Sequence, residues 1–386
     1  CKNFIVQRNG YIYFQHEEER HFIYTNIPEH KLKDFHSLIV LDFIQSGTTE
    51  DFSFTMIDHV FFAFENLNEE QRQFLLDLFI RVIEKANFTA AFEYGFQLCC
   101  KVVDLYGYEK LSRYKDECHF YCLATIHSFF SKNYEMMLDF YNHLNIEKYN
   151  GNYEKLEVQE YVAEYFQQIG QIDEAIELCV CALQKLGFTV ATNVSTLTLR
   201  RKQYLLKKKL QNLNDFEKKS EMVNPKDILI MRYLAKMIPI IFFLRKKDAI
   251  FLTCKMVDFT LEHGKCFISP FAFALYGSLL VKEQHNFEDG VFLAQTALAM
   301  LDEIKGVEFV SQTIFFAVFF AAHWKLSHDQ IHSWINRAVN YENDYGCSTF
   351  GIVCNNILPL YSCFSGMHLK QILTTVNCRV NNFFDQ

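Results

Sequence analysis

Apolar residues recur at helical spacing through most of the chain, in segments that share one plan: an amphipathic helix, a short polar joint and a second helix. The clearest segment is 155–187, in which two apolar stripes flank a turn at Gly170. The same plan fits three further segments, 228–264, 269–306 and 307–346. We therefore expect helical hairpins that stack, because a single hairpin of this size cannot bury its own apolar face.

A glycine ends the second helix of each expected hairpin. Gly264, Gly306 and Gly346 lie 42 and 40 residues apart, and Gly107, Gly187 and Gly264 lie 80 and 77 residues apart. Glycine is favoured after a helix because the backbone there often becomes left-handed. The spacing predicts an all-α, TPR-like superhelix (α-solenoid) of stretched hairpins, helical from about residue 52 to 384.

The segment CKMVDFTLEHGKCFISPFAFALYG (254–277) contains one such joint. We expect Gly264 to end one hairpin as a left-handed cap, and Ser269 to cap the next helix with Pro270 in its first turn. Residues 267–268 then fill the seam between the hairpins.

The first 48 residues have a different pattern. Residues 11–18 alternate as in a short strand, a helix is expected from about Glu18 to Asn26, and a second one at 31–47 after Pro28. We expect a small winged-helix-like remnant at 1–48, followed by the helical repeat array at 49–386.

Composition agrees with a helical chain, since 386 residues include only 5 Pro and 14 Gly against 40 Phe. A net charge of −8 argues against a nucleic-acid partner. The longest apolar runs, 237–244 and 313–322, are too short to span a bilayer, which takes about 18 residues or more. The 13 Cys are odd in number and irregularly spaced, so we expect reduced thiols and a cytoplasmic protein. The chain opens on Cys1, which suggests a piece of a longer protein.

Three stretches carry residues of chemical interest. In HDQIH, His328 and His332 share a helical face, but Asp329 stands where zinc proteases carry Glu, so a solvated face is expected. In the basic stretch 199–221, a phosphate- or membrane-facing role is possible in principle. We favour an interpretation in which the lysines of this stretch stay hydrated and its leucines pack inward. These leucines are Leu205, Leu206, Leu210 and Leu213.

The third stretch is the joint itself, where His263 and Lys265 could form a catalytic or ligand site rather than a connection. The sequence contains no GxxxxGK[ST] loop, no GxGxxG, no HRD or DFG pair and no G-x-S-x-G elbow. We therefore predict no catalytic, cofactor-binding or metal-binding residue in this chain.

Several motifs together resemble one family. FQHEEERHFIYTNIPE (14–29) is similar to the segment that closes the ATPase module of large signalling kinases, and CKMVDFTLEHGKCFISPFAFALYGSLL (254–280) is similar to a run in their helical array. Further similar stretches are AIELCVCALQKLGF (175–188), HW (323–324) and 346–369. The first match rests on Phe14, His16, Tyr24, Ile27, Pro28, Glu29 and His36, whereas Glu17, the pair 22–23 and Cys347 depart from the pattern.

The family is the hybrid histidine kinases. They run from a Ser/Thr-kinase-like domain through an AAA/STAND-type ATPase and a tetratricopeptide-like array to a GAF sensor and a histidine kinase. The resemblance implies that this chain is the tail of the ATPase plus the array. ATP would bind in other domains of the parent protein, and no cofactor is expected in this fragment.

The resemblance thus implies a non-catalytic regulatory and scaffolding segment of a two-component signalling kinase. Its partners would be the neighbouring domains and a protein or peptide in a concave groove. Two alternatives stay open: the helical C-terminal region of a protein like soluble adenylyl cyclase, and a free-standing TPR-like peptide receptor. Flanking sequence separates them, because the kinase predicts a downstream H-box and the cyclase an upstream pair of cyclase domains.

Overall fold

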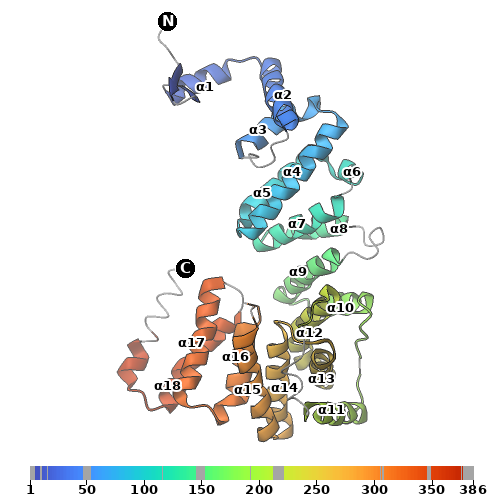
Figure 1. Ribbon diagram of the computed structural model, residues 1–386, viewed down its shortest axis with the longest axis vertical. Helices are drawn as coiled ribbons and strands as arrows, with labels where there is room; N and C mark the ends of the chain where they lie inside the picture. Colours follow the sequence, from blue (N-terminus) through green and yellow to red (C-terminus); the bar gives the residue numbers. More distant parts are fainter. Residues whose placement is uncertain are drawn as a thin grey trace. The chain divides into compact units, whose positions relative to one another are not determined.

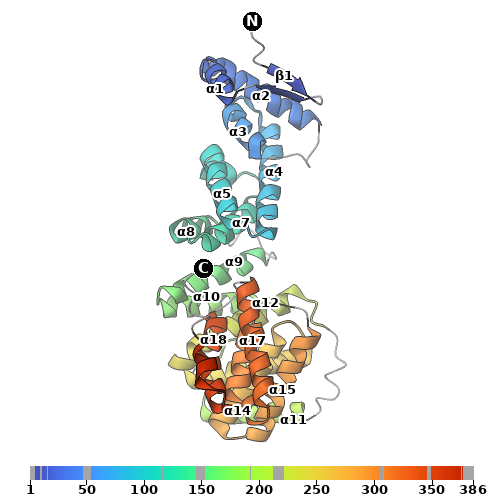
Figure 2. The same cartoon turned by 90° about the vertical axis from the view of Figure 1, so that its left-hand side faces the viewer.

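The protein is described by a computed structural model, and the residues it describes are 5–8, 11–14, 16–46, 54–114, 116–144, 153–191, 193–211, 221–304, 306, 308–345, 349–374 and 376. Its internal contacts divide the chain into two units, Cys1–Tyr165 and Phe166–Gln386. The division falls within helix α9 (Glu154–Gln168). Figure 1 and Figure 2 show that helices make up most of both units.

The first unit begins with a β-hairpin and two helices. Strand β1 (Ile5–Arg8) pairs antiparallel with β2 (Tyr11–Phe14), in the register that sets Ile5 opposite Phe14. Helices α1 (Glu17–Thr25) and α2 (Glu29–Ser46) follow. They are separated at Pro28, because the residue before a proline is disfavoured in helical conformation. The predicted strand and both helices are confirmed within a few residues, while β1 is an addition that the alternation pattern did not predict.

The rest of the first unit is helical. Its elements are α3 (Phe54–Ala63), the 3₁₀ turn η1 (Phe64–Asn66), α4 (Glu69–Phe88), α5 (Phe92–Tyr106), α6 (Tyr108–Leu111), α7 (Glu117–Phe130), α8 (Tyr134–His143) and most of α9. A capping box starts α4, because Asn68 and Gln71 each accept the other's backbone N–H through their side chains. α4 packs on α5, α5 on α7 and α7 on α8, around a core that buries Phe79, Phe120 and Phe140.

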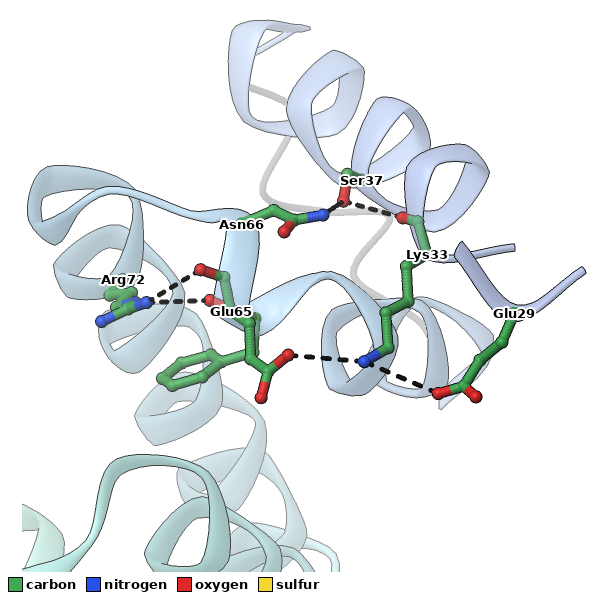
Figure 3. Close-up of polar contacts among 7 residues, drawn as sticks. Glu29, Lys33, Ser37, Glu65, Asn66 and Arg72 are labelled. Atoms are coloured by element: carbon green, nitrogen blue, oxygen red, sulfur yellow. Dashed lines mark hydrogen bonds and ion pairs between the residues drawn. The ribbon is translucent and has the colours of Figure 1, made fainter. Parts of the chain in front are cut away.

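Helix α2 is attached to the turn between α3 and α4 by the polar contacts drawn in Figure 3. Lys33 Nζ lies 3.4 Å from Glu65 Oε2 and 3.7 Å from Glu29 Oε1. Asn66 Nδ2 donates to Ser37 Oγ at 3.0 Å, and Ser37 Oγ donates to the Lys33 carbonyl at 2.8 Å. We call Lys33, Ser37, Glu65 and Asn66 the α2 link. It joins residues on either side of the expected boundary near residue 48.

The second unit is an array of consecutive helices. They are α10 (Ile172–Lys185), α11 (Thr196–Leu210), α12 (Pro225–Leu244), α13 (Lys246–His263), α14 (Ser269–Gln284), α15 (Phe287–Glu303), α16 (Val310–Ile314), the π-helical η3 (Phe315–Phe319), the 3₁₀ turn η4 (Ala322–Trp324), α17 (His328–Tyr345) and α18 (Thr349–Phe364). From α12 to α15 each helix packs on the next, as Figure 1 shows. The helix pairs predicted in 228–264 and 269–306 are confirmed, and so are both helices of 155–187.

The hairpin of α14 and α15 is held together by a close backbone approach. A Cβ on Gly277 would lie 2.7 Å from the carbonyl oxygen of Gly290, and a Cβ on Gly290 would lie 2.8 Å from that of Gly277. Two facing glycines therefore let the helices come closer than any pair of side chains would allow. Thirteen consecutive residues of α14, Ser269–Val281, are buried, which makes this helix the centre of the unit.

The joint after α13 requires glycine, although not for the predicted reason. Gly264 has φ 107° and ψ 180°, which is a region that only glycine adopts readily, and not the left-handed helical region. The extended backbone lets Lys265 form a parallel β-bridge with Glu221. In this contact the Met222 N–H donates to the Lys265 carbonyl at 2.7 Å. The expected left-handed cap at Gly264 is therefore wrong, because this segment continues as a strand-like contact with the residues that precede α12.

The start of α14 also differs in detail. Pro270 lies in its first turn, as predicted. Ser269 does not cap the helix, since its Oγ accepts the N–H of Cys266, three residues earlier, at 2.9 Å. Ile268 is fully buried and Phe267 is half-buried, so the two residues fill the seam as expected.

The regularly spaced glycines are required for different structural reasons. Gly187 has φ 76°, as expected after a helix, whereas Gly107 has φ 68° with ψ 149° and, like Gly264, lies outside the left-handed helical region. Gly306 has no positive φ, and a Cβ there would lie 2.6 Å from Cβ of Phe267. Close packing therefore selects glycine at this position. Gly346 lies outside the described residues.

The aromatic run 313–322 does not form the regular helix that the pattern predicts. α16 ends after one turn and continues as the π-helical η3 and the 3₁₀ turn η4. Ser278 of α14 donates to the Phe316 carbonyl at 2.7 Å, and His323 Nδ1 lies 3.0 Å from the Val318 carbonyl. Side chains thus bond carbonyls that a regular helix would use, and the hairpin expected at 307–346 is regular only in its second half.

The fold class is therefore all-α, of the TPR-like helical-hairpin (α-solenoid) type, with a β-hairpin and two helices ahead of the array. Among the residues that the structure describes, no helix is both long and apolar enough to cross a membrane. Several of the described cysteines, such as Cys99, Cys122 and Cys254, are free thiols buried in the core.

Candidate functional site

A groove of about 480 Å³ lies in the second unit between α11 on one side and α14 with α15 on the other. Its volume falls within the range of roughly 300–1,000 Å³ usual for ligand sites. We call it the α11 groove. Its lining includes Arg200, Tyr204, Lys207, Tyr276, Asp289 and Phe292.

Helix α11 is placed by one apolar face. Leu199 and Leu206 are buried, and α11 packs on α13. The helix starts at a cap in which Ser195 Oγ accepts the Thr198 N–H at 3.1 Å. The buried face fixes which side chains of α11 point toward the groove, since the groove residues recur at i, i+4 and i+7.

An ion cluster fixes α11 on α13. Asp258 accepts hydrogen bonds from Lys202 and, at 2.5 Å, from Lys209, whose Nζ also lies 2.7 Å from Glu262 Oε1. Burial alone would raise the pKa of the Asp258 carboxyl, but the hydrogen bonds from the two lysines outweigh it and lower the pKa. Hydrogen bonds to Asp258 and Glu262 raise the pKa of Lys209. Asp258 and Lys209 therefore keep their charges at neutral pH, and the cluster holds α11 in place.

A second ion pair crosses the groove wall. Lys207 Nζ lies 2.7 Å from Asp289 Oδ2, at the start of α15. Asn286 caps α15 and also donates to the Asp289 carboxylate at 2.7 Å. The hydrogen bond from Lys207 lowers the pKa of Asp289 against the opposing effect of burial. The Asp289 charge is thus neutralised by Lys207.

The rim of the groove is aromatic and basic. Tyr204 is 60% exposed and Phe292 is 54% exposed, on opposite walls. Lys208 Nζ lies 4.7 Å from the centre of the Tyr204 ring. In the described part of the chain, no carboxylate pairs with Arg200, Arg201 or Lys208. The groove therefore offers unneutralised positive charge beside exposed aromatic surface.

The basic stretch 199–221 was interpreted correctly only in part. Leu206 is buried, Leu210 is half-buried, Leu205 is 46% exposed, and Leu213 lies outside the described residues. Leu205 was expected inside, but adjacent helical positions point about 100° apart, so only one of the two can face α13. Lys202 does not stay hydrated, because it is paired with Asp258. The signal for the groove was the series of cations without an acid in 196–210.

The residues of the joint have structural partners. His263 Nδ1 lies 3.0 Å from Asp227 Oδ2 of α12, and its ring stacks on Phe259 with 4.0 Å between centres. Lys265 Nζ lies 3.3 Å from Glu303 Oε2 of α15. The two side chains are thus bound to carboxylates on different helices, which favours the connection over a catalytic site.

The HDQIH stretch lies at the start of α17. His328 and Asp329 are exposed, as expected for a solvated face. His332 Nε2 lies 3.2 Å from Ser362 Oγ of α18, so it links two helices. Within the described residues there is no group of three or more His, Cys, Asp or Glu side chains that could hold a metal ion.

The first unit contains a histidine cluster around the buried His36 that the sequence did not indicate. His36 Nε2 lies 2.8 Å from the Tyr24 hydroxyl, His36 Nδ1 lies 2.5 Å from His59 Nδ1, and the His36 ring stacks on Phe62. Burial, and then the neighbouring His59, lower the pKa of His36. The cluster joins α1, α2 and α3 and favours the neutral form of His36.

No protein-family model and no curated protein matches the chain. Among solved structures, the chain is similar to a signal transduction ATPase with numerous domains (STAND) protein with a tetratricopeptide repeat sensor from Pyrococcus horikoshii. That likeness has 11% identity and a TM-score of 0.38, and it covers 99% of this chain but 57% of that protein. A circular tandem repeat protein is 12% identical, with 96% of this chain and 91% of that chain covered and a TM-score of 0.18. Both TM-scores are low, so the assignment of fold rests on the helix packing described above.

Proposed function

We propose that this chain is a non-catalytic scaffolding and protein-interaction segment. The observation that carries the proposal is the α11 groove, where exposed Tyr204 and Phe292 lie on opposite walls beside the unpaired cations of α11. Exposed aromatic and arginine side chains at a recessed site are typical of surfaces that bind proteins. The repeat plan of stacked hairpins provides a rigid support for such a surface.

We further propose that the parent protein is a hybrid histidine kinase acting in a two-component phosphorelay in the cytoplasm. Residues 1–48 would close its ATPase module, as a winged-helix-like remnant, and residues 49–386 would form the array that leads to the output kinase. The resemblance in the stretches 14–29 and 254–280 supports this assignment. ATP would bind in other domains, and the partners of this chain would be proteins rather than nucleic acid.

The α2 link gives this proposal a physical mechanism. If α2 moves with the ATPase module, the ion pair of Lys33 with Glu65 and the hydrogen bond of Asn66 to Ser37 pass that movement to the start of α4. A displacement at the nucleotide site would then bias the array through a small set of named contacts. Coupling through two alternative arrangements of such an element is a common way of switching.

The experiment compares variants of the full-length parent protein in a nucleotide-stimulated autophosphorylation assay. Lys33→Glu places a like charge beside both Glu65 and Glu29, and it should reduce stimulation at least severalfold while basal phosphorylation persists. Lys31→Glu, an exposed position of the same helix, is the matched control and should behave as wild type. Equal stimulation in both variants would contradict coupling through the α2 link.

Two alternatives have different consequences. A cyclase-like parent would carry a pair of cyclase domains upstream and would produce cyclic AMP instead of phosphohistidine. A free-standing peptide receptor would have no catalytic domain on either side. The complete reading frame separates the three, and the absence of an H-box downstream would refute the kinase assignment.

A further inference from the structure

We propose that the occupant of the α11 groove is an acidic peptide segment of a partner protein that carries a bulky apolar anchor residue between its carboxylates. The inference rests on the proposed function as a protein-interaction segment and names the chemistry of the partner. Its basis is the combination of charge and shape at α11, α14 and α15.

Around the groove, the carboxylates named above are paired with lysines, whereas some of the cations have no carboxylate partner among the described residues. Asp289 is neutralised by Lys207, and Asp258 and Glu262 are engaged by Lys202 and Lys209. Arg200 lines the groove without a carboxylate partner in the described part of the chain. On an otherwise acidic protein of net charge −8, this is a local positive region. Charge complementarity therefore favours a ligand with carboxylates.

Two further cations extend this region along the rim. Arg201 and Lys208 are exposed and lie three residues before and four residues after Tyr204, and therefore on the same side of α11. An arginine binds a carboxylate through two parallel hydrogen bonds, so Arg200 and Arg201 suit Glu or Asp side chains of an incoming segment. Carboxylates spaced along a peptide would follow the helix.

The anchor position lies between the two aromatic walls. Tyr204 and Phe292 are more than half exposed although they face a recessed volume, and Tyr276 and Leu280 of α14 lie among the residues that line it. An apolar side chain from a ligand would cover both rings, which contribute binding free energy when water is excluded from them. A volume of about 480 Å³ suits one or two side chains and a short stretch of backbone.

The competing occupant is an anionic membrane surface, because Leu197 is also exposed on α11. A flat bilayer would reach Leu197 and the rim cations but not the recessed surface of α14. Leu199 and Leu206, which a membrane-binding helix would present, are buried against the array. The recess therefore favours the peptide, and vesicle binding becomes an outcome of the test.

The test uses the complete 386-residue chain and a fluorescein-labelled peptide in which a Phe-Leu pair is flanked on both sides by glutamates. Fluorescence anisotropy should show saturable binding that weakens with added salt, since screening shortens the range of charge interactions from about 8 Å at 0.15 M to about 3 Å at 1 M. Replacing the glutamates by lysines, or the Phe-Leu pair by serines, should abolish binding.

Variants on the two walls separate charge from shape. The double variant Arg201→Glu with Lys208→Glu should bind at least about tenfold more weakly, a difference of ~1.4 kcal/mol. Phe292→Ser, on the opposite wall, should weaken binding by a similar factor without changing the salt dependence. Lys185→Glu, an exposed cation of α10, is the matched control and should leave binding unchanged. Circular dichroism of each variant confirms that it is folded.

Three results would overturn the inference: no saturable binding, equal binding of the lysine peptide, or equal binding by the double variant. Binding to phosphatidylcholine vesicles containing phosphatidylserine, without competition from the peptide, would assign α11 to a membrane surface instead. These results are independent of the autophosphorylation assay with Lys33→Glu. The scaffolding function can therefore fail or hold separately from the chemistry of the ligand.

Discussion

The imidazole of His127 in α7 occupies the space that a side chain on Gly95 of α5 would need. A Cβ on Gly95 would lie 2.3 Å from Cε1 and Nδ1 of the ring. His127 is fully buried, and its ring nitrogens lie 3.2 Å from the Phe92 carbonyl and 3.1 Å from the Ile83 carbonyl. One side chain of α7 thus reaches α4 and α5 at once, and the glycine allows it.

Gly95→Ala should therefore destabilise the first unit by about 1–3 kcal/mol, because overpacking forces a ring or a helix to move. Urea denaturation of the full chain measures the change. Gln97→Ala, on the exposed face of the same helix, is the control and should stay within about 0.5 kcal/mol of wild type. His127→Ala should remove most of the additional cost of Gly95→Ala. A strictly additive double variant would contradict the contact.

Stability should fall as the pH decreases below neutrality. Burial lowers the pKa of His127, against the smaller opposing effect of its contacts with two carbonyls. Because the folded pKa is below the unfolded value of about 6.5, the unfolded state binds more protons in this range. The contribution is present above about pH 6.5 and is lost as the pH falls from there through the folded pKa. His36 has the same sign, and its pKa is also lowered.

The slope of unfolding free energy against pH between 5 and 7 measures this contribution. His127→Gln and His36→Gln should each reduce the slope, which is at most about 1.4 kcal/mol per pH unit for one group. His328→Gln, at an exposed position, is the control and should leave the slope as in wild type. A slope that is unchanged in both buried variants would refute the assignment.

Helical periodicity predicted the hairpins well where each helix follows its own pattern. The α12–α13 and α14–α15 pairs are examples, since short polar joints between apolar stripes are local signals. The π-helical η3 could not be predicted. Its Phe316 carbonyl accepts a hydrogen bond from Ser278, which lies in the preceding hairpin, and such a distant partner leaves no local signal in the sequence.

The α11 groove could not be predicted from the sequence for a similar reason. Both Leu205 and Leu206 fit an inward apolar stripe, and only the position of α13 decides between them. The partners of Lys202 and Lys209 lie about fifty residues further along the chain, at Asp258. Local charge patterning identified the helix as basic, but the neutralisation of some of its cations depends on tertiary packing.

The two ion pairs of α11 should differ in their effect on stability. Asp258→Asn leaves Lys202 without its charge partner at a nearly buried site, although Lys209 keeps Glu262, so the variant should cost about 3 kcal/mol. Asp289→Asn disrupts a pair whose side chains are 56% and 41% exposed, and it should cost less than about 1 kcal/mol after solvent screening. Thermal melts of both variants give the ranking, and equal losses would contradict the role of Asp258 in holding α11.

Asp258 also loses its stabilising contribution in acid, but for a different reason from the histidines. Its pKa is lowered by hydrogen bonds that favour the charged form, whereas burial lowers the pKa of each histidine by favouring the neutral form. Its folded pKa is lowered, so its contribution is present above the usual carboxyl range near pH 4 and is lost as the pH falls through the folded pKa. Melts between pH 2 and pH 5 should show a steeper loss in wild type than in Asp258→Asn. The same loss in both would assign the acid sensitivity to other carboxyls.

Variants at the joint between α13 and α14 separate the conformational requirement for Gly264 from a chemical role of His263. Gly264 has φ 107° and ψ 180°, where a β-branched residue is strained, so Gly264→Val should cost about 1–3 kcal/mol. It should also break the contact of Met222 with Lys265, which depends on this conformation. His263→Ala removes a half-exposed contact with Asp227 and should change stability by about 0.5 kcal/mol or less. Thermal melts of both variants, together with the output of the full-length parent, decide the matter. Normal melting of Gly264→Val would refute the backbone argument, and loss of output in a stable His263→Ala variant would assign chemistry to the histidine.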